Sequence, residues 1–317
     1  MTKYRQNLPQ LGGETFLTDG GMETTLIFHR GLDLPHFASF PLLDDENGRL
    51  ELTRYYESYL DIARRHDQGF ILDTPTWRAS PDWGEKLGYD REALRALNQR
   101  SVAYIADLRR EWERPGAPII LNGVIGPRGD AYKLGRMDAG EAEEYHSFQI
   151  DAFSGTEADM VTALTLNKVE EAIGIVRAAS AAELPCVVSF TVETDGKLAD
   201  GVSLREAIER TDAATNGTAA YYMVNCAHPT HFESALRADS PWVRRISGVR
   251  ANASTKSHAE LDDSTELDIG DPGDLARRYR RLRVDYPTMT VLGGCCGTDH
   301  RHLAAICEAC APRAAAE

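Results

Sequence analysis

The chain has 317 residues, a formal net charge of −14 and 42% hydrophobic residues. Nucleic acids and anionic membranes bind clustered positive charge, so this acidic balance argues against both as partners. Residues 1–10 lack the apolar stretch of a secretory signal, and no apolar run approaches the roughly 18 residues of a membrane helix. We therefore expect a soluble, cytoplasmic protein. Nothing in the sequence determines its oligomeric state.

Short apolar runs alternate along the chain with longer amphipathic segments. Each run is typical of a buried parallel strand, as in Pro-Cys-Val-Val-Ser-Phe at 185–190. Eight strands are expected, at residues 15–18, 69–76, 118–125, 159–165, 185–192, 220–226, 246–252 and 288–294. Helical patterns follow them, for example at 91–112, 138–153, 169–182 and 203–215.

Eight such β-then-α units predict an α/β protein, a single (β/α)8 TIM barrel that occupies residues 1–317 as one domain. A doubly wound open sheet is the alternative. The polar, acidic segment at 253–272 is expected to form a long loop after the seventh strand. The arginine-rich residues 277–283 have apolar positions at helical spacing, which indicates a solvated amphipathic helix face.

Polar residues occur where the expected strands end, which is where a TIM barrel builds its active site. They are Asp19, Glu23 and Thr24 after the first strand, Asp73, Thr76, Trp77 and Arg78 after the second, Asn122 after the third, Asn225 and Cys226 after the sixth, Asn252 after the seventh, and Cys295 and Cys296 after the eighth.

The adjacent thiols of Cys295 and Cys296 lie between glycines that permit a sharp turn. Successive side chains on a strand point to opposite faces, so both sulfurs converge only where the strand breaks. Two thiolates are soft ligands for zinc, and Cys226 is a candidate for a third, which would leave one coordination position open. Six cysteines in a chain of a reducing compartment are better explained by metal binding, reactivity or burial than by disulfides.

These motifs resemble the homocysteine S-methyltransferase family. That family contains zinc-dependent barrels, including betaine–homocysteine methyltransferase and the homocysteine-binding module of cobalamin-dependent methionine synthase. The matching pieces follow the family order over nearly the whole chain. They are Asp-Gly-Gly at 19–21, Thr76 with Ala79 and Ser80, Gly126 with Pro127, Asn225 with Cys226, and Gly-Gly-Cys-Cys-Gly-Thr at 293–298.

The resemblance implies that Cys226, Cys295 and Cys296 bind Zn2+, with the thiol of homocysteine in the open position. It implies methyl transfer from a small activated donor, of the S-methylmethionine, S-adenosylmethionine or betaine type, to give methionine. A corrinoid or other methyl-carrier protein stays open as a partner. Residues within matched motifs are expected to line the substrate pocket, namely Asp19, Thr24, Thr76 and Asn225. Asp19 could instead cap the following helix.

The chain departs from the usual family pattern at two places. Leu164 stands where many members carry a glutamate associated with the substrate's amino group, and Glu23 is a candidate replacement. The alternative for Glu23 is a surface position at a helix start. Trp77 and Arg78 replace the Phe-Gln or Phe-Tyr of relatives, and they suit a cationic donor that carries a carboxylate. Otherwise Trp77 packs in the rim and Arg78 is solvated.

Three further possibilities stay open. Cys307 and Cys310 could join Cys295 and Cys296 in a structural zinc site of a non-catalytic or thiol-redox protein, or share a buried helix face. His228 and His231 could compete as ligands or pack beside the site. The glycine-rich turn after the eighth strand could hold a phosphorylated substrate, although a phosphate site needs no pair of cysteines.

Overall fold

The barrel predicted from the sequence is present. A computed structural model describes residues 2–132, 137–236 and 240–311, so both ends of the expected 1–317 domain lie outside the described residues. Eight parallel strands form a closed barrel, and each overlaps its expected range. They are β1 (Phe16–Leu17), β2 (Gly69–Asp73), β3 (Ile119–Ile125), β4 (Met160–Leu166), β5 (Cys186–Phe190), β6 (Tyr221–Asn225), β7 (Ile246–Ala251) and β8 (Val291–Gly294).

Pairing between the first and last strands excludes the open sheet. Phe16 is in register with Val291, and Leu17 with Leu292. Because this pairing leaves no free edge, the carboxyl ends of all eight strands form one rim. The alternative of a doubly wound sheet is therefore wrong.

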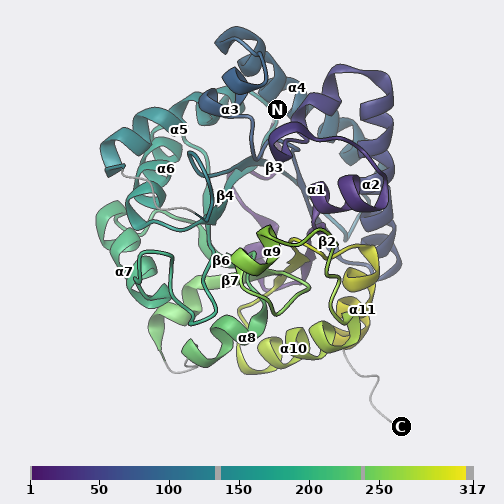
Figure 1. Cartoon of the computed structure of the whole chain (residues 1–317), viewed down its shortest axis with the longest axis vertical. Coiled ribbons are helices and arrows are strands. Elements are labelled where there is room, and N and C mark those ends of the chain that lie inside the picture. Colours follow the sequence, from purple (N-terminus) through teal and green to yellow (C-terminus); the bar gives the residue numbers. More distant parts are fainter. Residues whose placement is uncertain (1, 133–136, 237–239, 312–317) are drawn as a thin grey trace.

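Helices surround the strands or lie over the barrel (Figure 1). They are α1 (Met22–Thr24), α2 (Glu46–Arg65), α3 (Pro81–Lys86), α4 (Arg91–Trp112), α5 (Ala139–Ser154), α6 (Val169–Ala181), α7 (Leu204–Thr215), α8 (Pro229–Phe232), α9 (His258–Asp262), α10 (Pro272–Asp285) and α11 (His300–Cys310). None of the described helices combines the length and apolar character that a membrane crossing requires. The helices expected from 91, 138, 169 and 203 are confirmed, with ends shifted by no more than one residue.

The segment after β7 is more regular than expected. Within 253–272 the short helix α9 forms, and a capping box between Ser257 and Glu260 starts it. The next helix, α10, carries the arginine-rich residues and buries Leu275, Tyr279 and Leu282, as the spacing predicted. In Figure 1, α9 lies over the barrel, whereas α10 belongs to the outer ring.

Strand alternation divides the core into an inner and an outer layer. On β3, Ile120 and Val124 belong to the cluster inside the barrel, while Ile119, Leu121 and Ile125 pack in the larger cluster with the helices. This period of two follows from the opposite orientation of successive side chains. The long apolar runs in the sequence reflect burial on both faces of each strand.

Asp159, just before β4, ties the N-terminal segment to the amino end of the barrel. Its Oδ1 accepts hydrogen bonds from the backbone N–H groups of Lys3 and Tyr4, at 3.1 and 2.8 Å. Its Oδ2 accepts from Arg109 and from the N–H of Leu121, both at 2.9 Å. Asp159 is fully buried, and Arg109 is 7% exposed. The charge of Asp159 is therefore balanced at the end of the barrel opposite to the strand carboxyl ends.

Replacing Arg109 tests this anchor. We expect Arg109→Met to lower the free energy of unfolding by about 3–5 kcal/mol, because it leaves a buried carboxylate without its cation. The matched control is Arg110→Met, whose arginine is 61% exposed and pairs with Asp107. An exposed pair of this kind contributes at most about 1 kcal/mol. Urea unfolding measures both changes, and equal losses for the two variants would contradict the assignment.

Candidate metal and substrate site

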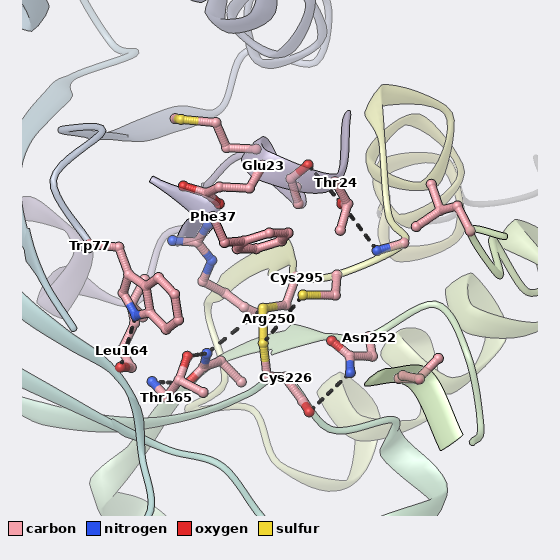
Figure 2. Close-up of a pocket in the computed structure, with 18 of the residues that line it drawn as sticks. Glu23, Thr24, Phe37, Trp77, Leu164, Thr165, Cys226, Arg250, Asn252 and Cys295 are labelled. Carbon is pink, nitrogen blue, oxygen red and sulfur yellow. Dashed lines mark hydrogen bonds between the residues drawn. A yellow bond between two sulfur atoms is a disulfide. The ribbon is translucent and has the colours of Figure 1, made fainter. Parts of the chain in front are cut away.

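Three cysteine sulfurs meet at the carboxyl ends of the strands. Cys226 follows β6, and Cys295 and Cys296 follow β8. The three sulfur atoms all lie within 4.8 Å of one another, the one such group of potential metal ligands among the described residues. Figure 2 shows the side chains of Cys226 and Cys295 directed at each other. The structure therefore brings together the three cysteines that the sequence suggested as zinc ligands.

A disulfide joins Cys226 to Cys295, and the sulfur of Cys296 lies 3.9 Å from that of Cys226. The expectation that the cysteines form no disulfide is wrong for this pair. Cysteine sulfurs that are close enough to bind one small ion are also close enough for two of them to form a disulfide. As a result, both sulfurs become metal ligands only after a thiol reductant supplies two electrons and the disulfide opens.

A tight turn after β8 directs both of its cysteines toward the cavity. The backbone N–H of Thr298 donates to the carbonyl of Cys295 at 3.0 Å, and its hydroxyl donates to the same oxygen at 2.7 Å. Gly297 has a φ of +78°, and a Cβ there would lie 2.5 Å from the carbonyl oxygen of Asp268. Glycine is required at this position both by the left-handed backbone and by the close neighbour.

Beneath the cysteines lies a buried ionic cluster built around Arg250, the penultimate residue of β7. Its guanidinium contacts the carboxylates of Asp19 and Asp73, and its Nε donates to the carbonyl of Gly294 at 3.2 Å. Tyr55 donates to Asp19 at 3.1 Å. All three charged side chains are at most 7% exposed.

Burial raises the pKa of Asp19 above its usual range, while Arg250 opposes that shift. The pKa of Arg250 is also set by burial and by charged neighbours, but here the neighbours prevail. Burial by itself would lower its pKa, but its two carboxylate partners raise the pKa above the ordinary value. Asp19 is paired with this arginine and does not cap a helix, because the residue that caps α1 is Gly21. Sequence reasoning missed Arg250, although an arginine near the end of an apolar strand was a usable signal.

A cavity of about 440 Å3 opens above this cluster. Its lining includes the three cysteines and six of the seven expected substrate residues, namely Asp19, Glu23, Thr24, Trp77, Arg78 and Asn225. Thr76 is the exception. It is fully buried, and its hydroxyl donates to the carbonyl of Val124 at 2.8 Å, which ties the segment after β2 to β3.

Asn225 orders the strand ends next to the cysteines. Its side-chain oxygen accepts hydrogen bonds from the N–H of Thr165 and the hydroxyl of Ser189, at 2.9 and 2.6 Å. Its Nδ2 donates to the hydroxyl of Thr165 at 2.8 Å and lies 3.8 Å from the sulfur of Cys295. These bonds connect β4, β5 and β6 and fix the residue that precedes Cys226.

Glu23 faces the cavity from α1 (Figure 2). The hydroxyl of Ser39 donates to its Oε1 at 2.7 Å. Burial raises the pKa of Glu23, and the hydrogen bond from Ser39 partly offsets that shift. Glu23 lies in the first turn of α1, as the alternative role expected, but it is half-buried and lines the cavity. Leu164 lines the same cavity from β4.

Trp77 and Arg78 form one wall of the cavity. The Nε1 of Trp77 donates to the carbonyl of Leu164 at 3.3 Å. The Arg78 guanidinium lies 4.3 Å from the centre of the Trp77 ring and 3.8 Å from that of Trp83. It donates to the carbonyl of Gly129 at 2.8 Å, and its buried Nε has no hydrogen-bond partner. Arg78 is thus held between two indole rings and is not simply solvated.

The other cysteines and histidines do not join the metal cluster within the described ranges. Cys307 is buried on α11 and packs with Cys310 against the core, which agrees with a shared buried helix face. His231 contacts the carbonyl of Thr255 at 2.9 Å, and His228 contacts the hydroxyl of Thr230 at 2.8 Å. No four-cysteine site and no histidine ligand is formed by the residues that the structure describes.

The family model described as homocysteine S-methyltransferase matches residues 16–310. The chain belongs to the homocysteine S-methyltransferase family. It is an enzyme of that family, and its TIM barrel and cysteine triad agree with this assignment. No curated protein sequence matches the chain.

Similar solved structures include three forms of the homocysteine methyltransferase MmuM from Escherichia coli, each 19% identical in sequence. The oxidized form has a TM-score of 0.75 and the metallated form 0.73, and both matches cover 96% of this chain and 99% of that one. The apo form has a TM-score of 0.64, with 93% and 96% covered. At this identity the likeness shows the fold.

Removing Arg250 tests the ionic cluster of this family member. We expect Arg250→Met to lower the free energy of unfolding by about 3–5 kcal/mol, because two carboxylates stay buried without their cation. Arg250→Lys should recover little, since an ammonium group cannot bridge both carboxylates as a guanidinium does. In the control variant Arg245→Met, a 31% exposed arginine loses its contact with Asp212. Urea unfolding that finds Arg250→Met as stable as the control would contradict this account.

Proposed function

We propose that the chain is a zinc-dependent thiol S-methyltransferase that moves a methyl group from a small activated donor to homocysteine, giving methionine. The observation that carries the proposal is the convergence of Cys226, Cys295 and Cys296 on one point of a substrate-sized cavity, in a chain of this family. We place the reaction in the cytoplasm, where thiol reductants keep such cysteines reduced. We further propose that residues 1–317 act as one domain.

The donor set fits zinc. Three cysteine sulfurs within 4.8 Å of one another suit a four-coordinate ion and leave a position for a substrate thiol. When bound there, zinc would keep the acceptor thiol, with an ordinary pKa of about 8.5, ionised at neutral pH. Cys226, Cys295 and Cys296 would hold the ion once their disulfide is reduced.

The remaining residues bind and align the two substrates. We assign the acceptor amino group to Glu23, a lining carboxylate that Arg250 does not engage, because Asp19 and Asp73 are already paired with Arg250. Thr24 and Asn225 shape the cavity beside the sulfurs. The acceptor sulfur then forms its bond to the methyl carbon as the donor's bond to that carbon breaks, and the donor leaves with the electron pair. Alignment of the two reacting atoms is the main contribution of the cavity.

Trp77 and Arg78 fit a donor that is cationic and carries a carboxylate. The indole face attracts a sulfonium or quaternary ammonium group. The guanidinium of Arg78, which lines the cavity, supplies hydrogen-bond donors for a carboxylate. S-methylmethionine, S-adenosylmethionine and betaine all have both groups, so we propose this class of donor.

The decisive experiment is an activity screen of the reduced, zinc-loaded enzyme. Homocysteine is paired with each donor in turn, and methionine is measured. We expect methionine from at least one donor of the class. Activity only with a methylated corrinoid protein would replace the small donor by a carrier, and no methionine under any condition would contradict homocysteine as the acceptor.

Cys226→Ala is the matched variant for that screen. It removes one of three ligands, so we expect loss of stoichiometric zinc and of methyl transfer, with a folded barrel by circular dichroism. The control is Cys307→Ala, a buried thiol on α11 outside the cluster, which should retain zinc. Zinc retained by Cys226→Ala would favour a structural site elsewhere. A parent enzyme without zinc would favour the phosphate-binding alternative.

Glu23→Gln tests the anchor for the acceptor. The amide can still accept the hydrogen bond from Ser39 but lacks the negative charge. We expect the KM for homocysteine to rise roughly tenfold or more, because a hydrogen bond to a charged group contributes about 1.5–3 kcal/mol. Asp33→Asn, an exposed change in the same β1–α2 connection, is the control. Unchanged affinity for the acceptor in Glu23→Gln would exclude this role.

A further inference from the structure

Cys226 has an unusual backbone conformation for a metal ligand. Its φ is +52°, in the left-handed region that is disfavoured for a residue with a side chain. Its N–H donates to the carbonyl of Arg250 at 3.1 Å, which continues the ladder from β6 to β7. Such a conformation persists only where surrounding groups hold it.

Three side chains from two loops hold the carbonyl oxygen of Cys226. Asn252 donates through Nδ2 at 3.0 Å, as Figure 2 shows, and Nε2 of His258 lies 2.6 Å from the same oxygen. The hydroxyl of Thr191 donates at 3.4 Å. Thr191 follows β5, Asn252 follows β7, and His258 is the first residue of α9. A carbonyl oxygen has two lone pairs, so the two shorter contacts, from Asn252 and His258, occupy it, and Thr191 adds a longer one.

His258 is itself oriented from two other directions. Its Nδ1 lies 3.2 Å from Oε1 of Glu193, so one ring nitrogen faces a carboxylate and the other a carbonyl. The ring of Tyr132 packs against it with centroids 4.3 Å apart. His258 is 7% exposed. The ring therefore has one defined orientation, with Nε2 on the backbone of Cys226.

We propose that His258 is a positioning residue for the metal site, which together with Glu193 fixes the backbone of Cys226 and so the direction of its sulfur. Rotation of the Cys226 peptide would move the sulfur away from Cys295 and Cys296. The contact of His258 with Cys226 also links the metal site to the loop that carries α9. Asp262 and Leu267 of the same loop line the cavity. The inference rests on the proposed zinc site but on neither substrate.

The first test is zinc affinity, measured on the full-length reduced chain by competition with a chromophoric chelator. We expect His258→Ala to weaken zinc binding about 10–100-fold, the usual effect of removing a residue that orients a ligand. His258→Gln should recover part of the loss, because its amide nitrogen can reach the same carbonyl. If His258 only stabilised the fold, His258→Ala would lower the melting temperature but would not weaken zinc binding, and His258→Gln would restore no affinity.

His231→Ala is the matched control. His231 is 8% exposed and also contacts a backbone carbonyl, that of Thr255, which does not belong to a cysteine. It should bind zinc as the parent does. Equal losses in His231→Ala and His258→Ala would overturn the proposal, since they would show a general effect of loop packing. If His258→Ala does not fold, Glu193→Gln replaces it, with an expected loss of several-fold.

The second test needs no metal. The metal-free chain is equilibrated with reduced and oxidised glutathione, which exchange two electrons with the Cys226–Cys295 pair. We expect His258→Ala to shift this equilibrium several-fold toward the dithiol, because a less constrained Cys226 meets Cys295 less often. A parent chain that fails to bind zinc would contradict the proposed function alone, and this equilibrium would then decide the role of His258. An unchanged equilibrium together with unchanged zinc affinity would overturn it.

Discussion

The pairing of β1 with β8 closes the barrel, and it also brings the segments that follow these two strands into one site. Beyond the strands, the N–H of Gly294 donates to the carbonyl of Asp19 at 2.8 Å, and the N–H of Gly21 donates to that of Thr298 at 3.1 Å. A Cβ on Gly293 would collide with the hydroxyl of Thr18. The glycines on both sides of this seam therefore permit a backbone approach that places the cysteine turn beside α1.

The ion pairs beneath the cavity determine which charged side chains can still bind a substrate. Arg250 pairs with Asp19 and Asp73, so the two innermost carboxylates are engaged within the protein. Leu164 adds no charge at the end of β4. Glu23 lines the cavity and accepts a hydrogen bond from Ser39, and Trp77 and Arg78 form a wall of the same cavity. A cysteine site with Glu23 and Arg78 on the cavity wall suits two small zwitterionic or cationic substrates.

The loop after β7 contributes both to the cavity and to the metal ligands. Its short helix α9 carries His258 onto the carbonyl of Cys226, and later residues of the same loop cover the cavity. The cysteine turn is connected to this loop as well, because the N–H of Ala253 donates to the carbonyl of Cys296 at 3.1 Å. Packing of this loop and the geometry of the three sulfurs are therefore parts of one structure.

The sequence by itself determined the positions of the eight strands and the main helices, and it indicated which three cysteines come together. Apolar runs of strand length mark buried parallel strands, and adjacent cysteines between glycines at a strand end indicate soft metal ligands. Only the tertiary structure decided the partners of those residues. Arg250 pairs with Asp19 and Asp73, which are 231 and 177 residues away in the sequence. The hydroxyl of Thr76 bonds to the backbone of Val124 and does not face the cavity, and the ring of His258 contacts the carbonyl of Cys226. Local patterns report burial and backbone conformation, whereas these contacts depend on which strand ends meet when the barrel closes.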